Sequence, residues 1–80
     1  MRARLLEAIA EHERGELDHA GLKRTVEGVM RTLARVDDPV HEALFEADIA
    51  LEYAMDGRPP EGDRSANLKR MRRNLREALR

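Results

Sequence analysis

The segment from Asp38 to Asp56 carries apolar residues at helical spacing on two opposite sides, and this pattern constrains the fold most strongly. Pro39 suits the first position of a helix, where its missing N–H is no loss, and Asp38 is a good N-cap beside the positive helix end. Gly57 follows directly and is a natural helix stop. One apolar side holds a helix in a small bundle, whereas a second apolar side needs a partner inside or outside the chain.

A helical wheel separates the two sides of this segment. With Val40 at zero and about 100° per residue, an ordinary core stripe forms on one side. This stripe consists of Val40, Leu44, Ala47, Leu51, Ala54 and Met55. Phe45, Ile49 and Tyr53 fall on the opposite side, at roughly 140°, 180° and 220°. The row contains both the one Phe and the one Tyr of the chain.

The row of Phe45, Ile49 and Tyr53 has two interpretations that the residues leave open. It is either a second core face buried within the monomer or an aromatic-aliphatic anchor row inside an acidic rim, which is the anatomy of a protein interface. The second interpretation predicts a partner-binding site that receives a basic surface. The predicted site comprises Glu42, Phe45, Glu46, Ile49, Glu52, Tyr53 and Asp56.

Turn signals divide the chain into predicted helices at about 2–14, 18–36, 39–56 and 64–79. Gly15 suits the left-handed position that ends the first helix, and Asp18 then caps the second. The Gly- and Pro-rich residues 57–62 are expected to form an extended loop. Short loops join antiparallel neighbours, so residues 1–80 are predicted to form a single all-α domain, a four-helix up-down bundle. The alternative is a three-helix bundle with a projecting basic fourth helix.

Two glycines, Gly21 and Gly28, lie inside the second predicted helix. Each costs about 1 kcal/mol relative to alanine in a helix interior. They are seven residues apart and share a helix face, so the close approach of another helix is one explanation for both. The other explanation is that evolution has simply tolerated the two glycines at these positions.

Charge is divided unevenly along the chain. Residues 1–62 carry 8 Lys/Arg and 14 Asp/Glu, whereas residues 63–80 carry 7 Lys/Arg and only 2 Asp/Glu. The last helix therefore has a narrow apolar seam between basic flanks. Three interpretations are open. The helix is a solvated basic helix whose seam docks on the bundle and whose arginines pair with acids of helix 39–56, a coiled-coil dimer through its seam, or a nucleic-acid-binding helix. The lack of interleaved aromatic residues and of helix-turn-helix spacing argues against nucleic acid.

The composition limits how much core the chain can build. Eighty residues without cysteine make one domain. Its length is near the lower limit for domains that fold without disulfide bonds or structural metal ions. Many of the hydrophobic residues are alanines, so a thin core is expected, and oligomerisation or partner binding would add stability. No stretch is long enough to span a bilayer, and Glu7 and Glu11 interrupt any signal-peptide pattern, so a cytoplasmic location is expected. Arginine strongly outnumbers lysine, which is associated with GC-rich bacterial genomes.

The sequence contains no catalytic or ligand-binding signature. His12, His19 and His41 share no evident metal-binding face and are expected to be surface residues. No Gly-rich phosphate loop and no nucleophile–base set is present. A bundle of this size also leaves little room for a catalytic pocket. We therefore expect no enzyme activity, no cofactor and no metal.

Three stretches carry a resemblance to a known class of proteins: LLEAIAEHERGEL, LKRTVEGVMRTLARVDD and ALEYAMD. They give an apolar helix, a glycine turn, a second helix ending before an acidic pair, and a third helix with aromatic residues. Over roughly residues 5–56 this pattern resembles the small helical immunity proteins of bacteriocin and contact-dependent toxin systems. The resemblance implies a compact four-helix protein that binds and blocks a cognate toxin, with Glu52, Tyr53 and their neighbours involved. The chain differs in lacking tryptophan in its third helix and in its basic last helix.

Three functional hypotheses follow. The first is a protein-binding module, an immunity- or antitoxin-like inhibitor that occludes a cognate toxin through the acidic, aromatic-centred face of helix 39–56. Its acidic rim would pair with a basic cleft and set association rate and specificity. The second is a self-assembling structural module, a homodimer through the third or fourth helix. The third is a small nucleic-acid-associated regulator that uses the basic last helix.

Overall fold

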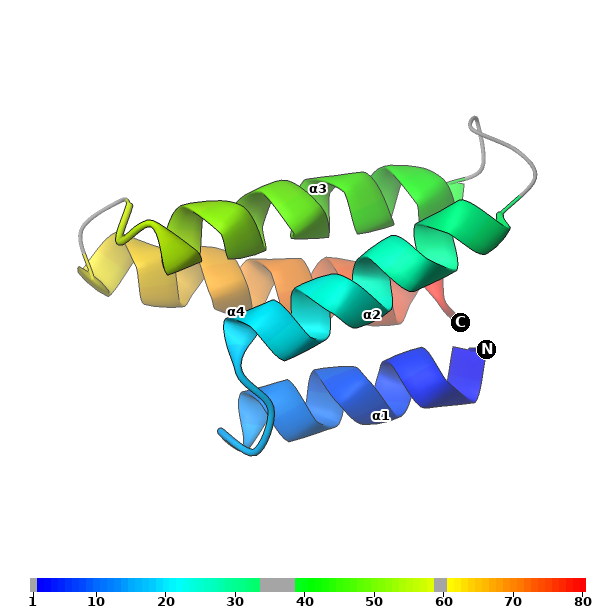
Figure 1. The fold of residues 1–80 in the computed structure, drawn as a ribbon, viewed down its shortest axis with the longest axis horizontal. Helices are drawn as coiled ribbons and strands as arrows, with labels where there is room; N and C mark the ends of the chain where they lie inside the picture. The colour runs from blue at the N-terminus through cyan, green and yellow to red at the C-terminus, as the bar shows by residue number, and fades with distance from the viewer. Residues whose placement is uncertain (1, 34–38, 59–60) are drawn as a thin grey trace.

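The computed structural model describes residues 2–33, 39–58 and 61–80 of the chain. These residues form four helices: α1 (Arg2–Glu13), α2 (His19–Thr32), α3 (Pro39–Met55) and α4 (Glu61–Ala78). Each helix runs antiparallel to the next, and both chain ends lie at the same end of the molecule (Figure 1). α2 and α4 lie between α3 on one side and α1 on the other. The prediction of an all-α four-helix bundle is confirmed.

The fourth helix is an integral part of this bundle. Met71 and Leu75 of α4 and Leu79 directly after it are buried on the side that faces the other helices, and they belong to the same core as residues of α1, α2 and α3. The alternative of a three-helix bundle with a projecting fourth helix is therefore wrong. None of the helices formed by the described residues is both long enough and apolar enough to span a membrane.

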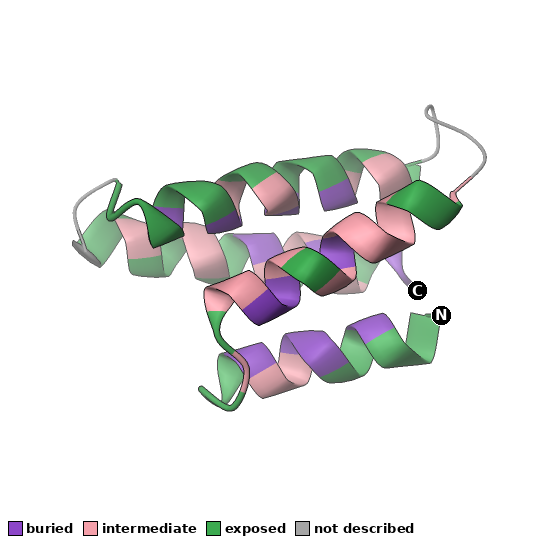
Figure 2. Ribbon diagram, in the orientation of Figure 1, coloured by how far each residue is buried: buried purple, intermediate pink, exposed green. Residues whose placement is uncertain are grey.

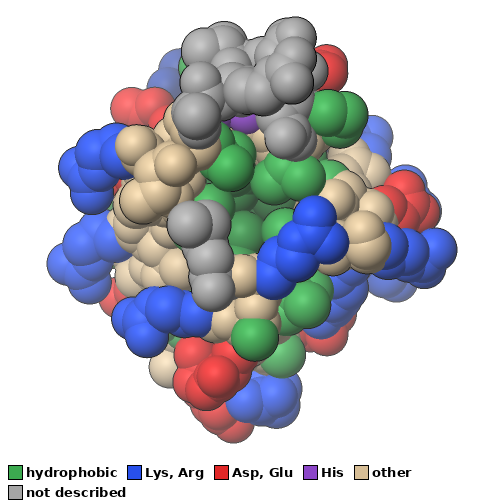
Figure 3. All heavy atoms as spheres, turned by 90° about the vertical axis from the view of Figure 1, so that its right-hand side faces the viewer, with side chains coloured by type: hydrophobic (Ala, Val, Ile, Leu, Met, Phe, Trp, Pro, Cys, Tyr) green, Lys and Arg blue, Asp and Glu red, His purple; other side chains and the backbone are tan. Residues whose placement is uncertain are grey.

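The core is built from aliphatic side chains. The largest fully buried ones are Leu5, Ile9, Leu22, Val26, Leu44, Leu51 and Leu75. Burial of each such side chain stabilises the fold by about 1.5–3 kcal/mol. Figure 2 shows the buried positions on the inner sides of the helices. Figure 3 looks onto the end of the bundle that carries both termini, where hydrophobic side chains gather in the middle and charged side chains surround them.

The turn between α1 and α2 forms as its residues predict. Gly15 has a φ of 80°, and its N–H donates to the carbonyl oxygen of His12 at 3.1 Å. The N–H of Glu16 reaches back to the carbonyl of Glu11 at 2.8 Å, which satisfies the end of α1. The Asp18 carboxylate then accepts a hydrogen bond from the N–H of Gly21 at 2.7 Å and caps α2.

Two helix boundaries differ from the sequence prediction. α4 begins at Glu61 rather than at residue 64, so Gly62 and Asp63 belong to its first turn instead of a loop. Asp63 is a favourable residue there because a carboxylate stabilises the positive end of a helix. α2 ends at Thr32, since Leu33 already has the extended φ and ψ of −78° and 129°. The predicted continuation to residue 36 and the predicted Asp38 cap lie outside the described residues.

The polar contacts between helices also differ from the prediction. One interpretation of the last helix paired its arginines with acids of α3, but Arg72 and Arg76 contact Glu13 of α1 instead. The guanidinium of Arg76 lies 2.8 Å from the Glu13 carboxylate, and that of Arg72 lies 3.8 Å from it. The hydrogen bond from Arg76 holds the pKa of Glu13 below its usual value. On the other side of the bundle, Lys23 of α2 pairs with Asp48 of α3 at 3.0 Å.

Truncation of one α4 side chain tests whether this helix is part of the cooperative core. Leu75→Ala removes a fully buried side chain and is expected to lower the free energy of unfolding by about 2–5 kcal/mol. Leu6→Ala, at an exposed leucine of α1, is the matched control and is expected to change it by less than about 1 kcal/mol. Urea unfolding followed by circular dichroism measures both. Equal, small effects would show that α4 does not share the core.

Candidate protein-binding face

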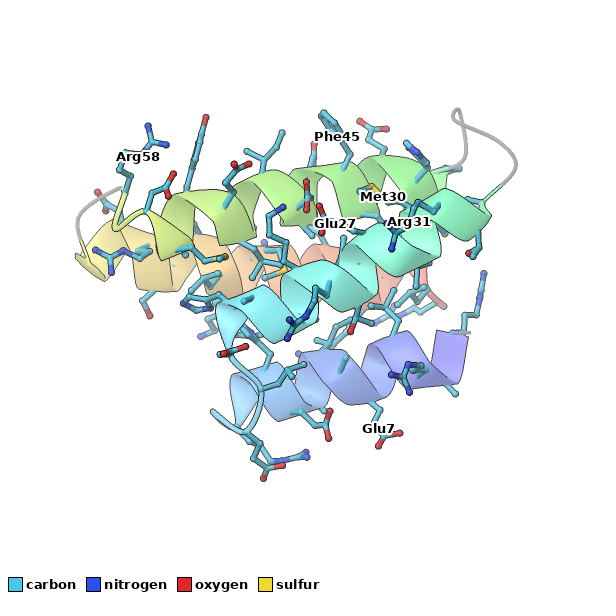
Figure 4. The ribbon with its side chains drawn as sticks, viewed as in Figure 1. Glu7, Glu27, Met30, Arg31, Phe45 and Arg58 are labelled. Carbon is cyan, nitrogen blue, oxygen red and sulfur yellow. The ribbon has the colours of Figure 1, made fainter. Side chains whose placement is uncertain are left out.

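The row of Phe45, Ile49 and Tyr53 lies on the outside of the molecule. These side chains are 54%, 36% and 48% exposed, respectively. Figure 4 shows Phe45 pointing away from the bundle, on the side of α3 opposite α1. The interpretation of this row as a second core face is therefore wrong. α4 lies beside the row and does not cover it.

The inner side of α3 determines this orientation. Leu44, Ala47 and Leu51 are fully buried between α2 and α4, and Ala54 is nearly so. A row half a turn away must then face outward. Met55 was predicted to belong to the core stripe, but it is 50% exposed because it is the last residue of α3 at the edge of that stripe.

Carboxylates surround the exposed row. Among the described residues, none forms an ion pair with Glu42, Glu46 or Glu52, so these charges are free to meet a partner. Their side chains project from the same outer side of the helix as the row. We call the whole surface the α3 face. It comprises Glu42, Phe45, Glu46, Ile49, Glu52, Tyr53 and Asp56.

The structure adds Arg58 to one end of the α3 face, and sequence reasoning missed it. Its guanidinium pairs with the Asp56 carboxylate at 3.0 Å and lies 5.0 Å from the centre of the Tyr53 ring. Such a contact attracts the cation to the face of the aromatic ring. The tight turn at Gly57, with a φ of 74°, brings Arg58 back over the helix end. The sequence did contain a signal for this contact, since a basic residue directly follows the glycine that ends the helix.

A groove runs along the border between the α3 face and α4. It encloses about 240 Å³, with Ile49 and Tyr53 on the α3 wall and Arg70 on the α4 wall. Its lining also includes Ala43, Glu46, Ala47, Ala50, Asn67, Met71 and Asn74. The α3 face is therefore not flat. The groove beside it can receive an anchoring side chain of a partner.

A second polar cluster joins three helices away from the α3 face. His12 of α1 is only 7% exposed, and its Nε2 lies 2.9 Å from Nδ1 of His19 in α2. The guanidinium of Arg72 in α4 lies 3.2 Å from Nδ1 of His12. The expectation that His12 and His19 are separate surface residues is wrong. They lie seven residues apart across the Gly15 turn, which brings the end of α1 against the start of α2.

The contacts assign the protonation of this cluster. Arg72 can only donate, so His12 Nδ1 accepts, and the one proton of a neutral His12 ring is on Nε2. That N–H donates to His19 Nδ1, which must be unprotonated. Burial lowers the pKa of His12 to about 4, and electrostatic repulsion from the protonated form of His19 and from Arg72 acts in the same direction. Asp18 opposes this shift but does not outweigh it.

The histidine cluster does not form a metal site. Within the described parts of the chain, no three His, Cys, Asp or Glu side chains lie close enough together to hold a metal ion. The two rings instead use their facing nitrogens for a hydrogen bond to each other.

Comparisons with known proteins found no resemblance that bears on this site. No family model, no curated protein and no solved structure matches the chain.

The histidine cluster makes a pH-dependent contribution to stability. The pKa of His12 is about 4 in the folded protein, whereas an ordinary histidine, as in the unfolded chain, has a pKa of 6.5. This contribution is therefore fully present above pH 6.5 and is lost as the pH falls towards 4. The loss is up to roughly 3 kcal/mol, since each pKa unit corresponds to about 1.4 kcal/mol.

Urea unfolding between these pH values measures this effect. His12→Gln keeps a hydrogen-bonding side chain but cannot titrate, so its stability is expected to fall less steeply with acidification than that of the wild type. His41→Gln, at the histidine of α3, is the control and is expected to follow the wild type. Parallel pH profiles for the wild type and His12→Gln would contradict the assignment.

Proposed function

We propose that this protein binds another protein through the α3 face and that the partner presents a basic surface. The observation that carries the proposal is the exposure of Phe45, Ile49 and Tyr53 in one row. Scattered exposed apolar residues are normal on proteins, whereas an apolar row with an acidic rim is the arrangement of an interface with a desolvated centre. A bundle of this size also gains stability from such burial.

Electrostatics support a basic partner. Glu42, Glu46 and Glu52 have no intramolecular ion pair among the described residues, and α3 contains no lysine or arginine. A partner with basic groups would be steered towards this face, which raises the association rate more than the final affinity. Binding is then expected to slow as salt is added.

The finer proposal is inhibition of a toxin, as the resemblance to immunity proteins implies. In this mechanism the α3 face covers a basic cleft of the toxin, such as one that binds nucleic acid. The groove beside Ile49 and Tyr53 would receive an anchoring side chain. Inhibition would come from steric exclusion of the toxin's substrate, and this chain would supply no reacting group.

Nucleic acid is the weaker candidate for the partner. Two arginines of the basic helix, Arg72 and Arg76, are already engaged with α1 through Glu13. Arg72 is also committed to the contact with His12. These side chains are therefore not available for phosphate groups without breaking contacts that hold α1 to α4.

Alanine substitutions on the α3 face separate binding from folding. Phe45→Ala and Tyr53→Ala are expected to leave the free energy of unfolding within about 1 kcal/mol of the wild type, because both side chains are about half exposed. Each is expected to weaken partner binding by at least tenfold, which is the effect of losing more than about 1.4 kcal/mol at a hot spot. Leu6→Ala on α1 is the surface control.

The measurement is affinity capture from the source cells with wild-type and variant proteins, followed by titration of the identified partner in purified form. The wild type and Leu6→Ala should retain a basic protein, and the two α3 variants should lose it. If that protein is a toxin, its activity in vitro should be blocked by the wild type but not by Tyr53→Ala. A partner retained equally by all four proteins would refute the proposed site.

A further inference from the structure

A second open surface lies between α1 and α2, on a different side of the bundle from the α3 face. It is a hollow of about 520 Å³, larger than the groove beside α4. α1 lies across the molecule from α3, and Phe45 points away from it (Figures 1 and 4). We call this hollow the α1/α2 groove. It is lined by Arg4, Leu17, Gly21, Arg24, Thr25, Gly28, Val29 and Thr32.

Gly28 in this groove is not required by any close contact with the described residues. A Cβ atom added there would meet no atom within 4 Å. Its backbone is ordinary helix, where glycine costs about 1 kcal/mol relative to alanine. Gly21 is different, because an added Cβ would lie 2.5 Å from a methyl carbon of Leu17. The missing side chain at Gly28 leaves the groove open on its outer side.

The charge of the groove selects an acidic occupant. Arg4 and Arg24 are exposed on its walls, and neither forms an ion pair among the described residues. Its lining includes no carboxylate, although Glu7 and Glu11 line a smaller adjoining hollow of about 220 Å³. Gly28 and Val29 contribute apolar surface to its lining, beside the hydroxyl-bearing side chains of Thr25 and Thr32. A helix with an apolar row and acidic flanks matches this combination of charge and shape.

The chain itself presents such a helix on its α3 face. A symmetric contact between two α3 helices does not suit this face, however. In an antiparallel pair centred on Ile49, Glu42 lies opposite Asp56 of the other copy and Glu46 lies opposite Glu52. The like charges of Glu46 and Glu52 oppose one another on both sides of Ile49. Among the described residues, only Asp56 of these acids is offset, by Arg58 of its own copy. The α3 face is therefore better matched by a basic groove than by its own copy.

We propose that copies of this chain associate head to tail, with the α3 face of one copy seated in the α1/α2 groove of the next. The inference rests on the proposed function, because it uses the same α3 face and identifies a basic surface that this face fits. Phe45 and Ile49 would pack over Gly28, and the acidic rim would meet Arg4 and Arg24. Because the face and the groove are different surfaces of one molecule, the contact is heterologous and can extend beyond a dimer.

Complementation between two variants tests this geometry. Phe45→Glu disables the α3 face and leaves the groove intact, whereas Gly28→Gln fills the groove and leaves the α3 face intact. Each variant alone is expected to stay monomeric where the wild type shows a mass that rises with concentration in sedimentation equilibrium. An equimolar mixture is expected to form one-to-one heterodimers and nothing larger, because each pair retains a single working contact.

The controls separate folding effects from assembly. Gly62→Gln in α4 is the matched glycine variant, since an added Cβ there also meets no atom of the described residues within 4 Å, and it is expected to assemble like the wild type. Circular dichroism is expected to show both glutamine variants folded. Gly28→Gln is expected to be at least as stable as the wild type because glutamine is a better helix former than glycine.

Several outcomes would overturn the inference. A wild type that stays monomeric at every concentration reached would do so, as would assembly that survives Gly28→Gln or a mixture that remains monomeric. A monomeric wild type whose capture of a basic partner is still lost in Phe45→Ala would refute the head-to-tail contact and leave the proposed function standing. A monomeric wild type that also captures no basic partner would refute both the head-to-tail contact and the proposed function.

Discussion

Leu44, Ala47 and Leu51 pack the inner side of α3 between α2 and α4, and this packing fixes the rotation of the helix on which the external surface depends. Side chains half a helix circumference away must then face solvent. The ion pair between Lys23 and Asp48 joins α2 to the flank of the same helix. The aromatic row is exposed because the bundle places aliphatic side chains, and not its only Phe and Tyr, in the core.

The two sides of the molecule are held in different ways. α3 is held mainly by apolar packing on both of its inner flanks, whereas α1 adds polar links to the packing of its buried Leu5 and Ile9. It is joined to α4 by Glu13 and Arg76 and to both α2 and α4 through His12. Polar links of this kind respond to pH, while the packing of α3 does not. Acid is therefore expected to loosen α1 before it disturbs the α3 face. The α1/α2 groove lies next to the helix that is held by these polar contacts.

Much of the fold follows from local signals in the sequence. Gly15, Asp18 and Pro39 mark helix ends through backbone chemistry that acts within a few residues, and the apolar stripes identify the core. The contact of His12 with His19 depends instead on the angle at which α1 meets α2, which no local pattern encodes. Exposure of Phe45 likewise depends on how many helices surround α3, so the sequence left the core and interface interpretations equally open.

The central claim is that the outer side of α3 is free in the folded monomer, and Tyr53 reports on it directly because it is the only tyrosine and the chain has no tryptophan. Quenching of its fluorescence by acrylamide, measured on dilute folded protein and on protein unfolded in urea, tests the claim. We expect the two quenching constants to be similar, within about a factor of two, because the ring is 48% exposed in the fold. A folded protein whose Tyr53 is almost fully protected from acrylamide would contradict the account.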